Sequence, residues 1–152
     1  MTEYTTIERS IVIRASADSI QPHVSDFNQW VAWSPWEGMD PDLTRTYSGV
    51  PGTVGATYKW DGNRKAGAGT MTATAIAPTS VDVDLAFTRP FKSTSAVHFD
   101  LTERNGQTTI VWTMLSPKTL TSRAFGLLMN MEKMIGSDLE KGLASLKKVV
   151  ES

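Results

Sequence analysis

The segment from about Thr119 to Val150 limits most strongly how this chain can fold. Its pattern predicts one long helix, because Lys133, Ser137, Lys141 and Lys148 fall on the side opposite an apolar stripe. The stripe consists of Ala124, Leu128, Met131, Ile135, Leu139, Leu143, Leu146 and Val150. A long helix with one apolar face must bury that face against another element. The rest of the chain therefore has to supply an extended apolar surface.

The region from Leu43 to Leu115 has the pattern of short antiparallel strands separated by turns. Asn105-Gly106 is its strongest hairpin signal, because both residues readily adopt positive φ angles. One stretch alternates apolar and acidic residues in a way that buries one strand face: Val81, Val83, Leu85 and Phe87 alternate with Asp82 and Asp84. The region is predicted to form a meander of hairpins.

The residues before the meander predict a strand and two short helices. Ile7 to Arg14 reads as a first strand, and Ser16 offers an N-cap for a helix through about Val24. A second helical piece, from Asp26 to Ala32, should end before Ser34-Pro35. The predicted fold is α+β, a single domain over residues 1–152 in which a curved antiparallel sheet wraps the C-terminal helix. Such a sheet readily leaves a ligand cavity near the start of the helix.

A set of short motifs extends along nearly the whole chain. They are Trp33-Ser34-Pro35-Trp36, Asp40-Pro41, Gly55-Ala56-Thr57-Tyr58-Lys59-Trp60, Gly62-Asn63, Gly67-Ala68-Gly69, Arg89-Pro90-Phe91, Trp112-Thr113-Met114 and Ile135-Gly136-Ser137-Asp138-Leu139-Glu140-Lys141-Gly142-Leu143. Together with the element order, they resemble the START-like (SRPBCC) superfamily of helix-grip proteins, which includes the birch-pollen allergen type. The chain is most similar to the bacterial polyketide cyclase/dehydrase branch. The resemblance implies the helix-grip fold and a hydrophobic pocket.

That superfamily contains lipid carriers, hormone receptors, cyclases, stress proteins and oxygenase subunits, so the resemblance leaves the activity open. The composition of the chain argues against several other classes of function. A net charge of -1 and a pI near 6.1 give no electrostatic case for binding nucleic acid or an anionic membrane. The absence of cysteine excludes disulfides, thiolate metal sites and a cysteine nucleophile. No apolar stretch is long enough to span a bilayer, and the first residues lack the layout of a signal peptide, so a cytoplasmic protein is predicted.

Inward-facing apolar side chains are the candidates for lining the cavity. On the strands they are Trp60, Phe87, Phe99, Trp112 and Met114, and on the helix they are Leu128, Met131 and Ile135. Trp33 and Trp36 are candidates for an aromatic rim at its mouth. The alternative is that these residues are core, with the tryptophans plugging the open end of the sheet. His23 and His98 have no partner at metal-ligand spacing, so neither a metal nor another cofactor is predicted.

Glu132 is the best candidate for proton transfer, because it falls inside the apolar stripe of the C-terminal helix. A carboxyl facing a cavity has a raised pKa, which suits a general acid or base. The alternative is that it pairs with a neighbouring basic residue at the edge of the stripe. Tyr58 is a second candidate. Asp138 and Glu140 point away from the stripe and are expected to cap or to form salt bridges.

Three functions follow from these observations. The first is binding of a small hydrophobic or aromatic molecule, such as a lipid, a polyketide or a related metabolite. The second is a cyclase or dehydratase reaction in the same cavity. The third is an interaction or stress-response protein with an incidental cavity. An exposed strand or the tryptophan-rich segment offers a surface for a homodimer.

Overall fold

The computed structural model describes residues 4–36, 40–63, 66–89, 92–117 and 125–152, and for residues 4–5, 117 and 125–132 it describes the backbone. The order of elements is the predicted one, a strand, two short helices, six strands and a long helix. They are β1 (Tyr4–Ile13), α1 (Ala17–Ser25), the 3-10 helix η1 (Phe27–Ala32), β2 (Thr44–Ser48), β3 (Thr57–Asp61), β4 (Ala68–Ala77), β5 (Ser80–Arg89), β6 (Ser93–Arg104), β7 (Gln107–Pro117) and α2 (Phe125–Glu151).

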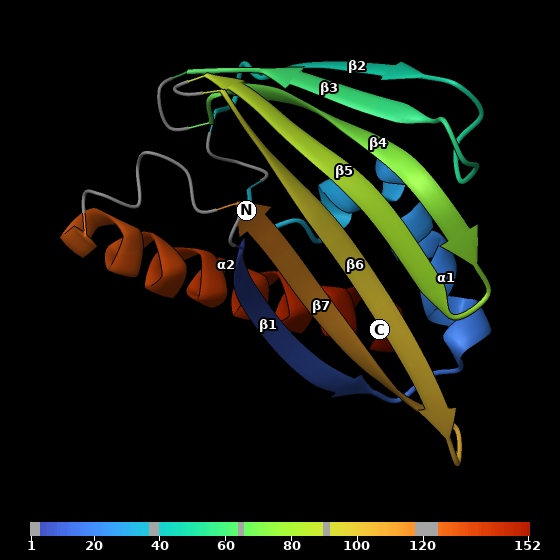
Figure 1. Cartoon of the computed structure of the whole chain (residues 1–152). Coiled ribbons are helices and arrows are strands. Elements are labelled where there is room, and N and C mark those ends of the chain that lie inside the picture. Colours follow the sequence, from blue (N-terminus) through green and yellow to red (C-terminus); the bar gives the residue numbers. More distant parts are fainter. Residues whose placement is uncertain (1–3, 37–39, 64–65, 90–91, 118–124) are drawn as a thin grey trace.

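The strands form one antiparallel sheet in the order β1-β7-β6-β5-β4-β3-β2. β2 to β7 are a meander, and β1 joins it at the far edge by pairing with β7, with Ile7 opposite Met114. Figure 1 shows the sheet curving so that α1 and α2 both lie on its concave side. The helix-grip architecture expected from the sequence is confirmed.

Local sequence signals explain where several elements begin and turn. The Ser16 side chain accepts a hydrogen bond from the Ser19 N–H at 3.2 Å and caps α1. Asp26 caps η1 in the same way by accepting from the Asn28 N–H at 2.9 Å. Asn105 and Gly106 both have positive φ angles, 56° and 77°, and form the two-residue turn between β6 and β7.

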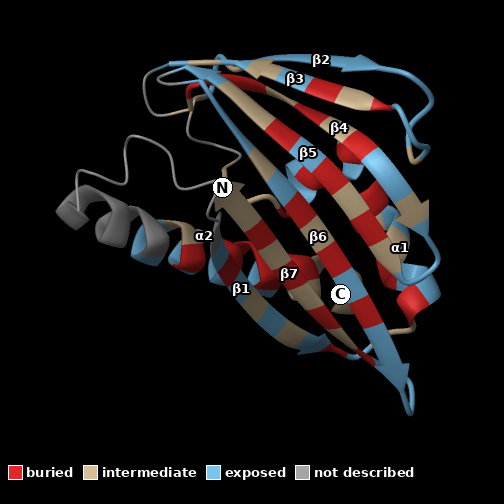
Figure 2. Cartoon of the chain, in the orientation of Figure 1, coloured by how far each residue is buried: buried red, intermediate tan, exposed pale blue. Residues whose placement is uncertain are grey.

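Burial follows the predicted periodicities of strand and helix (Figure 2). Val81, Val83 and Leu85 of β5 are buried. On α2, Leu139, Leu143 and Leu146 are buried, whereas Lys133, Ser137, Lys141 and Lys148 are exposed. The expected helix start near Thr119 lies outside the described residues, and the described helix runs from Phe125 to Glu151.

An aromatic cluster fills one end of the concave side. It consists of Phe27, Trp30, Trp33, Trp36, Phe99 and Trp112, with neighbouring ring centroids 4.7–6.1 Å apart. The indole N–H groups of Trp30 and Trp33 donate to the Val24 and His23 carbonyls at 2.9 and 2.8 Å. These bonds fix η1 and the following residues against α1, so Trp30 and Trp33 plug this end of the sheet.

The last turn of α2 is tied to the end of β1 through Glu151. Its carboxylate accepts a hydrogen bond from the Arg14 N–H at 2.8 Å and also pairs with Lys147. The hydrogen bond from the Arg14 backbone, followed by that from Lys147, lowers the pKa of Glu151 below its ordinary value of 4.5.

Replacing Glu151 by Gln is expected to cause a small, pH-dependent loss of stability. A folded-state pKa below the unfolded one means that the carboxylate stabilises the fold above the unfolded pKa, and that this contribution is lost as the pH falls through the folded pKa. The melting temperature of E151Q should therefore lie below that of the wild type at about pH 7, and the difference should shrink as the pH falls below 4.5, the ordinary pKa of this carboxyl group. A difference that stays the same as the pH is lowered would contradict this role for the carboxylate.

Candidate functional site

The inward-facing side chains of the sheet differ in how much solvent they reach. Phe99 and Trp112 are both 0 % exposed, and Met114 is also buried. Six other residues that face the inside are only half-buried: Trp36, Trp60, Phe87, Ser95, Ser116 and Ile135. We call these six residues the open part of the concave face. They come from β3, β5, β6, β7, α2 and the segment after η1. Because they are not fully buried, we expect them to be the side chains that a molecule entering the concave side would reach.

A row of aromatic rings crosses the sheet from its edge to this open part. Tyr47, Tyr58, Trp60 and Phe87 follow one another with ring centroids 5.1, 6.1 and 5.5 Å apart. The first three are stacked, and Phe87 meets Trp60 edge-on. This aromatic row contains two predicted site residues, Trp60 and Phe87, together with Tyr58, which is buried.

Trp60 lies flat against the neighbouring strand because position 69 is a glycine. A Cβ atom at Gly69 would come within 2.5 Å of both the Trp60 ring and the Ala86 carbonyl oxygen. The indole N–H of Trp60 donates to the Ala66 carbonyl at 2.9 Å, which fixes the ring from the other side. The Gly67-Ala68-Gly69 motif thus has a local reason, since it makes room for an aromatic surface.

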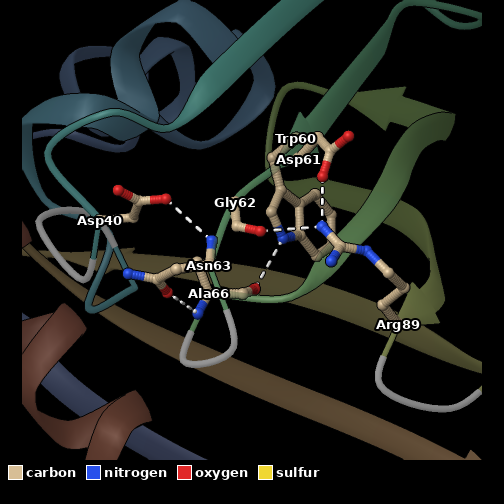
Figure 3. A network of polar contacts seen from close by, with 7 residues as sticks. All are labelled: Asp40, Trp60, Asp61, Gly62, Asn63, Ala66 and Arg89. Carbon is tan, nitrogen blue, oxygen red and sulfur yellow. Dashed lines mark hydrogen bonds and ion pairs between the residues drawn. The ribbon is translucent and has the colours of Figure 1, made fainter.

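A polar network holds the residues that follow Trp60 of β3, at the turn towards β4 that carries Ala66 (Figure 3). Arg89, at the end of β5, donates to the Gly62 carbonyl at 2.8 Å and pairs with Asp61. Asp40 accepts from the Asn63 N–H at 2.8 Å. Asp40, Asn63 and Arg89 all belong to the motifs noted in the sequence, and these contacts position the end of β3 and the following turn beside the aromatic row.

Contacts of α2 with the segment after η1 and with β1 position the part of the helix that borders the open part of the concave face. The Trp36 indole N–H donates to Asp138 at 3.2 Å, and Arg9 forms a salt bridge with Glu140 at 3.1 Å. The salt-bridge role expected for these two carboxylates is confirmed for Glu140, and Asp138 accepts a hydrogen bond instead of capping. Ile135 lies one turn before Asp138 and is half-buried.

The remaining predicted site residues are divided between the core and the undescribed side chains. Trp33, Phe99 and Trp112 belong to the aromatic cluster, and Met114 follows on β7. The predictions for Leu128, Met131 and Glu132 fall on the first turns of α2, where side chains lie outside the described residues. In the described part of the chain, no group of three or more His, Asp or Glu side chains could hold a metal ion.

The Ser95 and Ser116 hydroxyls were not among the predicted site residues. Their oxygens are 2.7 Å apart across β6 and β7. Ser95 is in phase with Val97 and Phe99, so the alternation of β6 was the signal that could have placed it on the inward face.

A hollow of about 500 Å³ lies on the opposite, outward face of the sheet. Its lining comes from four strands and consists mostly of outward-facing residues: Thr70, Thr72, Asp84, Ala86, Thr94, Ala96 and Leu115. Leu85 and Ser95, which alternate with these and face inward, border it as well. It is distinct from the cavity expected between the sheet and the C-terminal helix, which stays a prediction.

Comparison with protein families assigns the chain. The family model described as polyketide cyclase/dehydrase and lipid transport matches residues 4–151. The chain belongs to this family. No curated protein matches the chain in sequence.

Solved structures with the same fold include proteins of different kinds. The Aha1 dimer from Colwellia psychrerythraea superposes with a TM-score of 0.68 at 21% identity, covering 97% of this chain and 96% of that one. The Zhui aromatase/cyclase from a Streptomyces species has a TM-score of 0.71 at 12% identity and coverages of 98% and 94%. A protein from Thermobifida fusca has a TM-score of 0.71 at 19% identity and coverages of 95% and 92%. At these identities the similarity establishes the fold.

None of the helices in the described residues combines the length and the apolar character needed to cross a membrane.

Proposed function

We propose that this protein binds a small hydrophobic or aromatic molecule on the open part of its concave face. The observation that carries the proposal is the aromatic row, which ends in two half-buried rings, Trp60 and Phe87, beside an otherwise closed core. Binding sites for small apolar molecules are built in this way, from aromatic surface with a few polar groups. Membership of a family described by cyclase and lipid-transport functions supports the same reading.

The rigidity of Trp60 favours binding over a purely structural role. Its N–H is already bonded to Ala66, and its ring rests on Gly69, so the exposed part of the indole is fixed before any ligand arrives. A preformed surface avoids the entropic cost of ordering side chains on binding.

Replacing Trp60 by Ala is expected to weaken ligand binding by about 5-fold or more, since truncating an aromatic side chain that contacts a ligand costs upwards of about 1 kcal/mol. The measurement is fluorescence titration with N-phenyl-1-naphthylamine, a neutral aromatic probe. F87A should act in the same direction. Val12→Ala is the matched control, because Val12 is an exposed apolar residue on the outward side of β1. Equal affinities for W60A, V12A and the wild type would overturn the proposed site.

The natural ligand can be sought directly by native mass spectrometry of the purified protein, followed by denaturing extraction. A stoichiometric apolar molecule would support the proposal and identify its class. Absence of any bound molecule together with absence of saturable probe binding would favour an interaction protein with a filled interior.

A cyclase-type reaction in the same place is the second candidate, supported by the family description. Glu132 and Tyr58 stay its predicted proton-transfer residues. E132Q should abolish pH-dependent turnover of a poly-β-keto thioester, and unchanged turnover in that variant would remove Glu132 from the mechanism.

Self-association also stays a proposal. Trp30 and Trp33 are buried, so in the tryptophan-rich segment the apolar surface that reaches solvent comes from Val31 and the half-buried Trp36. The edge strand β2, whose residues are all exposed, is a second candidate surface, and the fold is shared with a protein solved as a dimer.

A further inference from the structure

The two serines of the open part lie among apolar side chains on the concave face. Ser95 pairs with Leu85 on one side and with Ser116 on the other, and Val97 follows it on the same face of β6. Met114 is the inward neighbour of Ser116 on β7. Leu85, Val97 and Met114 are all buried. The hydroxyl pair is thus a polar spot at the edge of an apolar surface.

The hydrogen-bonding capacity of this pair is only partly used. A serine hydroxyl offers one donor and two acceptor positions. The Ser95–Ser116 contact at 2.7 Å uses the donor of one serine and one acceptor position of the other. One O–H donor is left for a third group, and these half-buried hydroxyls make no other side-chain hydrogen bond within the described residues.

Thr108 provides the comparison within the same interior. It is fully buried on the inward face of β7, and its hydroxyl donates to the Ala15 carbonyl at 2.7 Å. The donor of the Thr108 hydroxyl is therefore already taken by a hydrogen bond within the protein. The Ser95–Ser116 pair keeps a donor and faces the side from which a ligand would approach.

The pair is adjacent to the end of the aromatic row. Phe87 is opposite Ser93, and Ser95 is the next inward residue along β6. Diagonal neighbours of this kind are about 7–8 Å apart, which is within the length of a bicyclic aromatic molecule. One ligand can therefore rest against Phe87 and Trp60 and place a polar atom on the serines.

We infer that the ligand of the open part carries a neutral oxygen, as a ketone or a hydroxyl group, which hydrogen-bonds to the Ser95–Ser116 pair. This inference rests on the proposed binding function and assigns its polar contact. The Ser95–Ser116 pair is uncharged and retains one O–H donor, so it suits a carbonyl oxygen attached to an aromatic ring system. Ser95 and Ser116 are then the residues that determine specificity.

Two probes of nearly equal shape test the inference. 2-Acetylnaphthalene carries a C=O group, and 2-isopropenylnaphthalene carries C=CH₂ in its place. Their dissociation constants are measured by displacement of N-phenyl-1-naphthylamine from the wild type and from S95A, S116A and the double variant. Thr94→Val, a change on the outward face of the same strand, is the matched control, and thermal melting verifies that each variant folds.

The readout is the ratio of the two dissociation constants, alkene over ketone, because it cancels general effects on the site. The ratio should fall by about 3- to 10-fold from the wild type to the double variant, the usual effect of one hydrogen bond, while alkene affinity is retained. It should not change in T94V. An unchanged ratio in the double variant, with both probes still bound, overturns the role of the serines and leaves the proposed function standing. Failure of the wild type to bind either probe overturns both.

Discussion

Replacing Trp33 by Ala is expected to lower the free energy of unfolding by about 3–5 kcal/mol, the usual cost of removing a buried large aromatic side chain. The Trp33 side chain is 2 % exposed and touches Trp30, Phe99 and Trp112. Its N–H is bonded to the His23 carbonyl, so the substitution opens a cavity and also removes a hydrogen bond. Few single changes in this chain should cost more.

Urea unfolding followed by circular dichroism measures this loss of stability. The variant Trp33→Phe separates the contribution of the ring contacts from that of the hydrogen bond. Phenylalanine keeps most of the ring contacts but leaves the His23 carbonyl without its donor, so a smaller loss is expected, including about 1 kcal/mol for the bond. W60A is the contrasting variant, because Trp60 is half-buried: it should lose binding more than stability. A W33A protein as stable as W60A would show that the aromatic cluster is not the plug described here.

Two glycines of α2 should respond oppositely to the same substitution. Glycine to alanine within a helix ordinarily stabilises by about 1 kcal/mol. At Gly142, a Cβ atom would lie 2.8 Å from Pro35 and 2.9 Å from the Trp112 ring, neither of which can easily move. G142A is therefore expected to destabilise by about 1–3 kcal/mol, as overpacking of a filled core does.

Gly136 is the matched control for this prediction. The Cβ of an alanine there would meet the end of the Arg9 side chain at 2.3 Å, and a half-exposed guanidinium can turn away. G136A should be neutral or slightly stabilising, because the Arg9–Glu140 salt bridge at risk is near the surface and is worth little. Chemical denaturation of both variants tests the pair. A stabilised G142A would mean that α2 does not sit as closely on Pro35 and Trp112 as the structure shows.

The sequence predicted the fold well because the fold depends on local periodicity. The Asn105-Gly106 turn and the Ser16 cap are each signals within a few residues of chain, and both were confirmed. The stripe of α2 is confirmed over its described part, where Leu139, Leu143 and Leu146 are buried. Alternation along the strands also identified the inward face correctly.

The site was less predictable, because exposure depends on distant packing. Phe87 and Phe99 both face inward on neighbouring strands but lie at opposite ends of the β5–β6 ladder, with Phe87 opposite Ser93 and Phe99 opposite Val81. Phe99 is fully buried against Trp30 and Trp33, whereas Phe87 stays half-exposed. The difference is decided by where the segment around η1 lands on the sheet. The Ser95–Ser116 pair likewise depends on strand register, which no local pattern specifies.

The pairing of β1 with β7 has a consequence for how the protein is made. β1 is an edge strand whose partner in the sheet is β7, so the strand ladder of Tyr4–Ile13 forms with Thr108–Pro117, at the other end of the meander. During synthesis, the first strand leaves the ribosome long before its partner exists, with Ile7 and Ile13 uncovered. Contacts this far apart in sequence slow folding and expose unpaired edges to aggregation. The nascent chain can build its hairpins as they emerge, but β1 can join the sheet only after β7 has been made.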